Sequence, residues 1–200
     1  MKKSFSHLIV LSSLLCIPFY VQAATETYEL DPGHSYVLWH ISHFGFSNPS
    51  GKWMAEGNII VDESKPQDAK VNVTIPVGNI VTGIPKLDEH LKSEDFFNVD
   101  KFPTATFVSK QIKITGKNTA DIQGILTLHG VSKPVTLKAQ LNKLGESPIT
   151  HTKTAGFTAT AELKRSDYDI KTYLPGLGDQ VKLSIEVEAK KVTADKPNAN

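Results

Sequence analysis

The chain has 200 residues, of which 22% are charged, and its formal net charge at pH 7 is +1. A balance this close to zero argues against nucleic acid and anionic membrane surfaces as partners. Cys16 is the only cysteine, which excludes an internal disulfide, so the fold must rely on core burial. A chain of this length can do so, since it buries roughly 70% of its unfolded surface, and without an internal repeat it favours a single domain.

The first residues have the layout of a secretory signal peptide. Lys2 and Lys3 give a positive start, an apolar run follows over residues 8–21, and Val21-Gln22-Ala23 places small residues at the positions that a signal peptidase recognises. The run is too short and too interrupted for a membrane-spanning helix, which needs about twenty apolar residues. We therefore predict a signal peptide over residues 1–23, cleaved after Ala23, and export of the rest of the chain.

Cys16 raises the alternative of a lipoprotein, because a lipid-modified cysteine also follows an apolar stretch. Leu15 precedes it, where that processing requires a small residue, so a cleavable signal is favoured. Cleavage would remove the thiol together with two of the 22 basic residues, which leaves a formal charge of −1 against 21 acidic residues.

Alternation of apolar and polar residues is the main signal in the rest of the chain. It is cleanest near the C-terminus, where Val181, Leu183, Ile185 and Val187 alternate with polar or charged residues. A period of two indicates a half-buried β-strand, and one wet face per strand indicates an antiparallel sheet. In chain order we predict strands at residues 27–30, 37–43, 53–61, 71–77, 104–110 with 111–115, 121–128, 135–141, 157–163 and 181–188.

Turn-forming residues separate these segments, at 31–33, 48–51, 116–118 and 129–134. One stretch departs from the β pattern. Pro85 suits the first position of a helix, and Leu87 and Leu91 follow with i, i+4 spacing. We predict one short helix over residues 85–95, lying across one end of the sheet. The polar, proline-interrupted segment 193–200 is predicted to be disordered, which leaves residues 24–192 as the folded domain.

A sheet of eight or nine strands hides its edges by packing in two layers or by closing into a barrel. Its inner face combines large residues such as Trp39 and Trp53 with small ones such as Ala55, Gly57 and Ala139. In an eight-stranded barrel, small inward residues either leave room for one ligand or accommodate the aromatic rings in a filled core, and alternation alone leaves both open. The inward-facing residues predicted to line such an interior are Val37, Trp39, Ile41, His43, Trp53, Ile59, Val73, Ile75, Phe107, Leu126, Leu128, Leu137, Phe157, Ala159, Ala161, Leu183 and Ile185.

The histidines near the N-terminal end of the domain invite a metal-site interpretation, which strand geometry disfavours. His40 and His43 point to opposite faces of one strand, and His34 lies roughly 20 Å from His40 at about 3.3 Å per residue. Ligand nitrogens must converge within about 2.1 Å of one ion. We predict no metal site and no cofactor.

Catalysis has weak candidates. Asp31, His34 and Ser35 are neighbours, but no G-x-S-x-G turn accompanies them, and His34-Ser35 is better interpreted as fixing the turn by hydrogen bonds to the backbone. The carboxylates of residues 88–95 could act as acid and base, yet they are interleaved with lysines, as on a solvated helix face. Both features favour a protein that is not an enzyme.

Arg165 is the only arginine in the chain, and Asp167 follows it at the end of a predicted strand. An ion pair between the two would order the corner, which is the favoured interpretation. Alternatively, Arg165 could meet an anionic headgroup at a barrel mouth, with His34 and Asp167 as further rim residues.

Four blocks of sequence, in order, are similar to those of the YceI-like family and cover nearly the whole domain, from about Thr27 to Lys191. The blocks are Asp31-x-x-His34-Ser35-x-Val37-x-Trp39-x-Ile41-x-His43-x-Gly45, then His90-Leu91-Lys92-Ser93-x-Asp95-Phe96-Phe97-Asn98 followed by Phe102-Pro103-x-Ala105-Thr106-Phe107, then Gly124-x-Leu126-Thr127-Leu128-x-Gly130-Val131-x-Lys133-Pro134-Val135, and finally Arg165-x-Asp167-Tyr168. One departure is Asp169, where many members have a glycine that permits a positive φ.

The resemblance implies a periplasmic protein with an extended, lipocalin-like antiparallel β-barrel that holds a polyisoprenoid or another lipid-like amphiphile. It implies no enzymatic activity, no cofactor beyond the bound lipid and no stable membrane insertion. The alternatives are an envelope adaptor whose barrel is filled by its own side chains, and an enzyme that acts on a prenyl or acyl substrate. The oligomeric state stays open, a dimer included.

Overall fold

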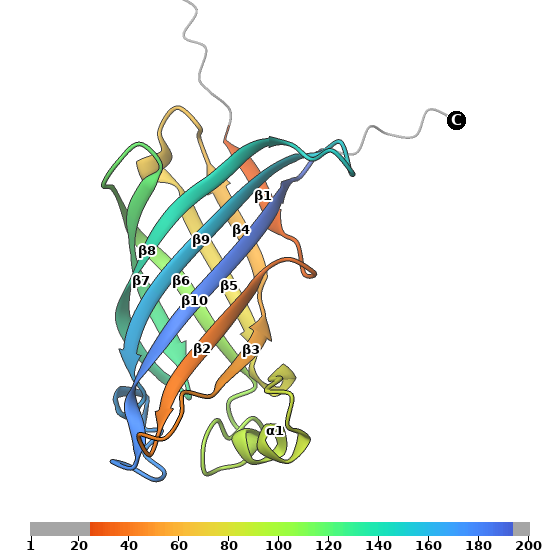
Figure 1. The fold of residues 1–200 in the computed structure, drawn as a ribbon. Helices are drawn as coiled ribbons and strands as arrows, with labels where there is room; N and C mark the ends of the chain where they lie inside the picture. Colours follow the sequence, from red (N-terminus) through yellow and green to blue (C-terminus); the bar gives the residue numbers. More distant parts are fainter. Residues whose placement is uncertain (1–24, 194–200) are drawn as a thin grey trace, which may run out of the picture.

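The computed structural model describes residues 25–193, so the predicted signal peptide and the predicted tail beyond Thr193 lie outside the described residues. Within this range, ten antiparallel strands form one sheet (Figure 1). They are β1 (Glu26–Leu30), β2 (Tyr36–His43), β3 (Ser50–Met54), β4 (Glu56–Val61), β5 (Lys70–Pro76), β6 (Thr104–Ile114), β7 (Thr119–Leu128), β8 (Val131–Glu146), β9 (Lys153–Lys164) and β10 (Leu177–Lys191).

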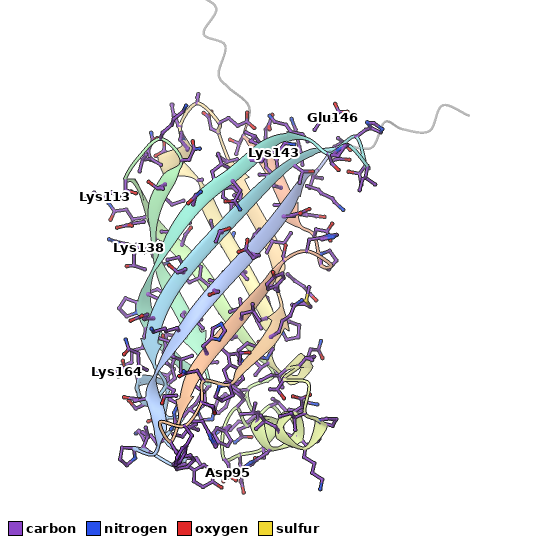
Figure 2. All side chains as sticks on the ribbon, viewed as in Figure 1. Asp95, Lys113, Lys138, Lys143, Glu146 and Lys164 are labelled. Carbon is purple, nitrogen blue, oxygen red and sulfur yellow. The ribbon has the colours of Figure 1, made fainter. Side chains whose placement is uncertain are left out.

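The sheet closes because β1 pairs with both β4 and β10, which completes a ring of eight ladders. The long strand β10 pairs with β2 along residues 177–186 and with β1 along residues 189–191. β1 and β2 therefore occupy the position of one interrupted strand. In the same way, β3 pairs with β2 and β4 pairs with β1. The predicted eight-stranded antiparallel barrel is confirmed, and charged side chains such as Lys113, Lys138 and Lys164 project outward from it (Figure 2).

Both interruptions occur at the same level of the barrel. Ser35, at the end of the β1–β2 connection, accepts a hydrogen bond through its carbonyl oxygen from the backbone N–H of Ala55, 2.9 Å away. Ala55 is the residue that separates β3 from β4, and only 1% of it is exposed. The single strand predicted over residues 53–61 is therefore two strands that bend together at one buried point.

Two predicted turns are misplaced. The chain reverses at His43–Phe46 rather than at 48–51, and Ser50 already lies in β3. The reversal predicted over 129–134 needs only His129 and Gly130, whose positive φ values of 51° and 75° suit a two-residue hairpin with inverted-type geometry. The rest of that segment belongs to β8, which begins at Val131.

The predicted helix is present as α1 (Pro85–Lys92), three residues shorter than expected. Ser93 ends it, because its extended backbone leaves the helix while its hydroxyl donates to the carbonyl oxygen of His90 at 2.8 Å. The helix lies at one end of the barrel (Figure 1), beside the short 3-10 segment η2 (Val77–Asn79). A third such segment, η3 (Arg165–Tyr168), joins β9 to the loop before β10, and η1 (Pro66–Asp68) joins β4 to β5.

The far half of the barrel, away from α1, contains a second cluster of packed side chains. Tyr28, Leu30, Ala55 and Ala189 form a buried cluster there, and larger side chains pack around it, namely Ile59, Val61, Val73, Ile75, Phe157 and Val187. A charged network lies beside this cluster. The hydroxyl of Tyr28 donates to Glu63 at 2.7 Å, and the carboxylate of Glu26 lies within hydrogen-bonding distance of Lys191, Lys153 and Tyr28.

We expect acid to weaken the fold through this network. The Lys191 ammonium group, helped by Tyr28 and Lys153, lowers the pKa of Glu26 from 4.5 to about 2. A carboxylate whose folded pKa is depressed contributes stability that is present above pH 4.5 and is lost as the pH falls through 2. Urea unfolding at a series of pH values below about 5 should show this loss, and Glu26→Gln should flatten the pH dependence. An equally steep curve in that variant would assign the effect to other carboxylates.

Candidate functional site

The half of the barrel next to α1 contains a cavity of about 520 Å³. This volume falls within the roughly 300–1,000 Å³ that is typical of small-molecule sites. Residues of β2, β3, β5, β6, β7, β9 and β10 form its wall, and residues of the α1 segment and of two loops line its end. Almost every lining side chain is apolar, so the cavity suits a molecule that is itself apolar along most of its length.

Nine of the residues predicted to line the interior do form this wall. They are Val37, Trp39, Ile41, His43, Trp53, Ile75, Leu126, Leu128 and Leu183. The four from β2 span six residue steps, or about 20 Å of strand. Since barrel strands tilt by roughly 35–45°, this corresponds to a depth of about 15 Å along the barrel axis.

Eight other predicted residues lie outside the cavity wall. Ile59, Val73 and Phe157 pack against the buried cluster around Tyr28 in the far half of the barrel. Phe107, Ala159 and Ala161 are buried. Leu137 and Ile185 are partly buried and are also absent from the wall. The period of two assigns a residue to the inner face but says nothing about its depth along the axis.

Prediction from strands missed the end of the cavity, because residues outside the strands line it. They include Phe44, Pro49, Val77, Ile84, Leu87, His90, Leu91, Phe96, Phe97, Ile170 and Tyr173. The apolar i, i+4 pair Leu87 and Leu91 was a signal that could have placed α1 over the opening. The loop residues carried no comparable pattern.

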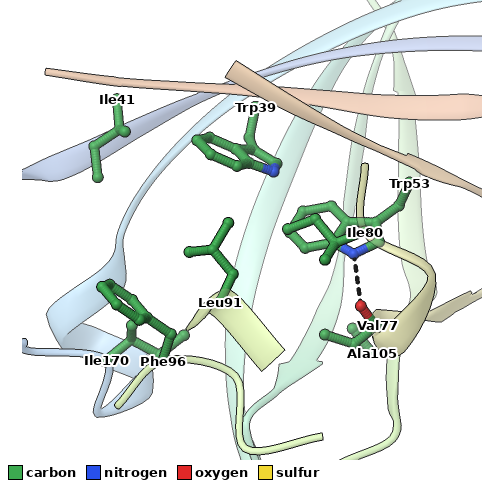
Figure 3. Close-up of a cluster of buried hydrophobic side chains, with 9 residues drawn as sticks. All are labelled: Trp39, Ile41, Trp53, Val77, Ile80, Leu91, Phe96, Ala105 and Ile170. Carbon is green, nitrogen blue, oxygen red and sulfur yellow. Dashed lines mark hydrogen bonds between the residues drawn. The ribbon is translucent and has the colours of Figure 1, made fainter. Parts of the chain in front are cut away.

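Buried side chains from the strands and from the helix segment meet at this end (Figure 3). Trp39 and Trp53 lie with ring centroids 6.3 Å apart. The Phe97 ring is nearly perpendicular to that of Trp53, with the two centroids 5.2 Å apart. The indole N–H of Trp53 donates to the carbonyl oxygen of Val77 at 2.9 Å, which holds the ring against the wall. Leu91 projects from α1 toward the same cluster.

Two glycines explain why large rings leave space in the barrel. Gly51 pairs directly with Trp39 across β2 and β3, and a Cβ atom at Gly51 would overlap the indole. A Cβ atom at Gly124 would likewise overlap the ring of Phe107. Glycine in a strand permits such close approach, so each ring packs closely over the neighbouring strand instead of filling the axis.

We expect Gly51→Ala to push the Trp39 indole away from β3 and into the cavity. The displaced ring should cost about 1–3 kcal/mol of unfolding free energy, as overpacking substitutions do. Urea unfolding would measure it, with Gly156→Ala as the control, because a Cβ atom at this strand glycine meets nothing closer than 3.9 Å. Equal stabilities for the two variants would contradict the packing argument.

The polar side chains that line the cavity are His43, His90 and Arg165, together with the hydroxyl-bearing Ser47 and Tyr173. The His90 ring lies 3.0 Å from the carboxylate of Asp95. His90 was not among the residues predicted to line the interior. Arg165, which is 4% exposed, donates to the carbonyl oxygens of Gly178, Ile170 and Leu177 at 2.8–3.0 Å. Burial lowers the pKa of this guanidinium group below its ordinary value.

The predicted ion pair between Arg165 and Asp167 is wrong. Asp167 is exposed on η3, and the carboxylate that acts on Arg165 at longer range is Asp179. Asp179 itself accepts hydrogen bonds from the N–H and the hydroxyl of Ser166, both at 2.9 Å. The corner between β9 and β10 is thus ordered by the Arg165 guanidinium group, which binds backbone carbonyls, and by the Asp179 carboxylate, which binds Ser166.

Asp169 adopts the left-handed conformation, with φ at 61°, in the position where the family pattern has glycine. Aspartate tolerates this region better than most residues. Its carboxylate also binds Lys171 at 2.8 Å. Asp169 therefore adopts the same positive φ that a glycine at this position would permit.

His34 and its neighbours lie away from the cavity. His34 is an outer-surface residue whose ring lies 3.3 Å from Asp31, while Lys190 and the N–H of Gly33 also bind that carboxylate. The hydroxyl of Ser35, fully buried, donates to the carbonyl oxygen of Glu188 at 3.0 Å. The interpretation of Ser35 as a residue that fixes the turn through the backbone is confirmed. Across residues 25–193, no three histidine, cysteine or acidic residues are grouped to hold a metal ion.

Comparisons with known proteins agree with this architecture. The YceI-like domain profile matches residues 28–189. A UPF0312 protein of Pseudomonas putida (strain W619) is 40% identical over 195 residues, which cover 96% of this chain and 98% of that protein. A UPF0312 protein of Pseudomonas aeruginosa (strain LESB58) is 41% identical over 170 residues, covering 84% of this chain and 88% of that one.

Solved structures share the fold. A mutant YceI protein of Campylobacter jejuni superposes with a TM-score of 0.69 at 30% identity, over 76% of this chain and 90% of that one. A polyisoprenoid binding domain from Saccharophagus degradans superposes with a TM-score of 0.61 at 14% identity, over 82% of this chain and 98% of that one. None of the helices in residues 25–193 is both long enough and apolar enough to span a membrane.

Proposed function

Because the chain belongs to the YceI-like family, we propose that it binds a polyisoprenoid or another lipid-like amphiphile in its barrel and acts as a periplasmic carrier or scavenger of this ligand between membranes. The observation that carries this proposal is the 520 Å³ apolar cavity, whose lining residues at the α1 end include the exposed Phe44 and Tyr173. The polyisoprenoid binding domain of similar fold supports this class of ligand. The periplasmic location rests on the signal peptide predicted over residues 1–23.

Burial of apolar carbon is enough to retain such a ligand. Each isoprene unit contributes roughly 3–4 kcal/mol at about 0.8 kcal/mol per CH₂ group, and part of this is offset by the cost of association and ordering. The side chains of His43 and His90 are placed to orient a head group, whereas the buried Arg165 guanidinium group is bound to three backbone carbonyls. Asp167 and His34, the other two predicted rim residues, do not reach the cavity.

Organic extraction of the purified protein followed by mass spectrometry tests the proposal. A carrier should release a long apolar molecule in a defined ratio to protein. A preparation that releases none, and that also fails to take up added geranylgeraniol, would instead support the envelope adaptor, whose barrel needs no ligand.

Specificity among chains of similar width should be loose, because the wall offers shape and apolar surface but few fixed polar partners. We expect geranylgeraniol and octadecanol to compete for the protein with dissociation constants within about tenfold of each other, or about 1.4 kcal/mol. A fluorescent fatty acid displaced by each alcohol provides the measurement. A preference of several hundredfold would point to a dedicated recognition site instead.

The enzyme alternative lacks an arrangement to support it. Ser35 donates to a backbone carbonyl, His34 lies on the outer surface, and His43 lines the cavity. A nucleophile and its base would need to lie within hydrogen-bonding distance of each other. Substituting the three residues separately should therefore change stability or ligand retention, and turnover of a prenyl or acyl ester would contradict a binding function.

A further inference from the structure

Large apolar side chains stand exposed around the opening of the cavity. Phe46 is 92% exposed, and Phe44, Ile84 and Tyr173 are between 49% and 58% exposed. Phe44, Ile84 and Tyr173 also line the cavity, so its inner wall continues without interruption onto the outer surface. They come from the β2–β3 loop, the segment before α1 and the loop before β10, which lie at one end of the barrel (Figure 1).

The β2–β3 loop and the loop before β10 are in direct contact. The backbone N–H of Phe44 donates to the carbonyl oxygen of Gly176 at 3.0 Å, and a side chain at Gly176 would overlap the Phe44 ring. Residues 41–51 include no aspartate, glutamate, lysine or arginine in a chain that is 22% charged. The exposed tip of this loop is therefore both apolar and free of formal charge.

Two of these aromatic residues adopt backbone conformations that do not suit them. Phe44 has φ at 52° and Tyr173 has φ at 63°. The left-handed region costs such residues roughly 1–2 kcal/mol, whereas glycine or asparagine would adopt it cheaply. Strain of this kind is concentrated at functional sites. Here it keeps two aromatic rings at the opening of the cavity.

We propose that this end of the barrel docks on the surface of a lipid bilayer, with Phe46 inserted among the lipids and Phe44, Ile84 and Tyr173 at the interface. The inference rests on the proposed carrier function. A bilayer is favoured over a protein partner because the patch surrounds the cavity opening. An apolar chain passing directly from lipid to cavity avoids exposure to water, at about 0.8 kcal/mol for each CH₂ group.

The experiment is co-sedimentation of the purified protein with phosphatidylcholine vesicles, which carry no net charge. The matched variants are Phe46→Ser and Ile149→Ser, because Ile149 is 87% exposed in the β8–β9 loop, at the opposite end of the barrel. We expect Phe46→Ser to weaken vesicle partitioning by roughly 10- to 100-fold, the loss of one buried phenyl group. Ile149→Ser should leave it unchanged. Because charge contributes little, added salt should have little effect.

A second measurement separates docking from ligand binding. Affinity for geranylgeraniol in solution should be equal in the wild type and in Phe46→Ser, while the rate of its transfer from vesicles should fall in that variant alone. Wild-type protein that binds geranylgeraniol but not vesicles would overturn the docking proposal, as would equal partitioning of the two variants. Capture of an envelope protein through Phe46, without vesicle binding, would also overturn it. Failure to bind geranylgeraniol at all would overturn the carrier function itself.

Discussion

Replacing Arg165 with methionine is expected to lower the free energy of unfolding by about 3 kcal/mol. Three backbone carbonyls, those of Gly178, Ile170 and Leu177, accept hydrogen bonds from its guanidinium group. Hydrogen bonds to a charged group are worth roughly 1.5–3 kcal/mol each, and the cost of burying the cation offsets part of that sum. Methionine fills similar space and offers no donor.

Lys164→Met is the matched control, because it removes the same charge one residue earlier from an exposed side chain. We expect it to stay within about 0.5 kcal/mol of the wild type. Arg165→Lys should recover little, since an ammonium group cannot present the planar set of donors that reaches three carbonyls. Urea unfolding followed by tryptophan fluorescence measures all three variants. Wild-type stability in Arg165→Met would show that the carbonyls find other partners.

The same substitution should also reduce ligand binding. Ile170 and Leu177, whose carbonyls Arg165 holds, both line the cavity. Losing the guanidinium group therefore loosens a part of the wall as well as the corner between β9 and β10. This double effect distinguishes a residue that organises the cavity from one that only contacts a head group.

The architecture could be predicted because a period of two runs through most of each long strand, although register shifts interrupt it in β6, β8 and β10. Val181, Leu183 and Ile185 all face inward in β10 as expected. The need to hide strand edges allowed either two layers or a barrel, and the family resemblance implied the barrel. What the period could not supply is position along the axis. Leu183 lines the cavity and Ile185 does not, although the two look equivalent in the sequence.

The α1 end of the cavity was beyond prediction for a different reason. Phe44, Phe96 and Tyr173 lie in loops, where no repeating pattern marks which side chain turns inward. The error over Arg165 has the same origin. Proximity in sequence favoured Asp167 as its partner, whereas the acceptors are the carbonyls of Gly178 and Leu177 in the returning strand β10 and that of Ile170 in the preceding loop.

Leu183→Trp should block the cavity while leaving the fold intact. Leu183 is partly buried, lines the cavity from β10, and lies between Trp39 and Ala161 on the two neighbouring strands. An indole there would occupy space now available to a ligand. Displacing about four CH₂ groups of a bound chain would cost about 3 kcal/mol, or roughly 100-fold in the dissociation constant for geranylgeraniol.

The control is Lys182→Trp, which places the same side chain on the same strand but on the outer face. Affinity should be unchanged in that variant. The two proteins are compared by displacement of a fluorescent fatty acid, with circular dichroism to verify folding. A folded Leu183→Trp protein that binds as tightly as the wild type would place the ligand somewhere other than the cavity.

The unfolding free energy of Leu183→Trp provides a second test of this prediction. In the absence of ligand, an indole that fills empty apolar space should leave the unfolding free energy unchanged or raise it by about 0.5–2 kcal/mol, as cavity-filling substitutions do. In a barrel with a solid core, the same substitution would overpack the interior and cost about 1–3 kcal/mol. Affinity that falls while stability holds is therefore the result expected only if the space beside Leu183 is where the apolar chain lies.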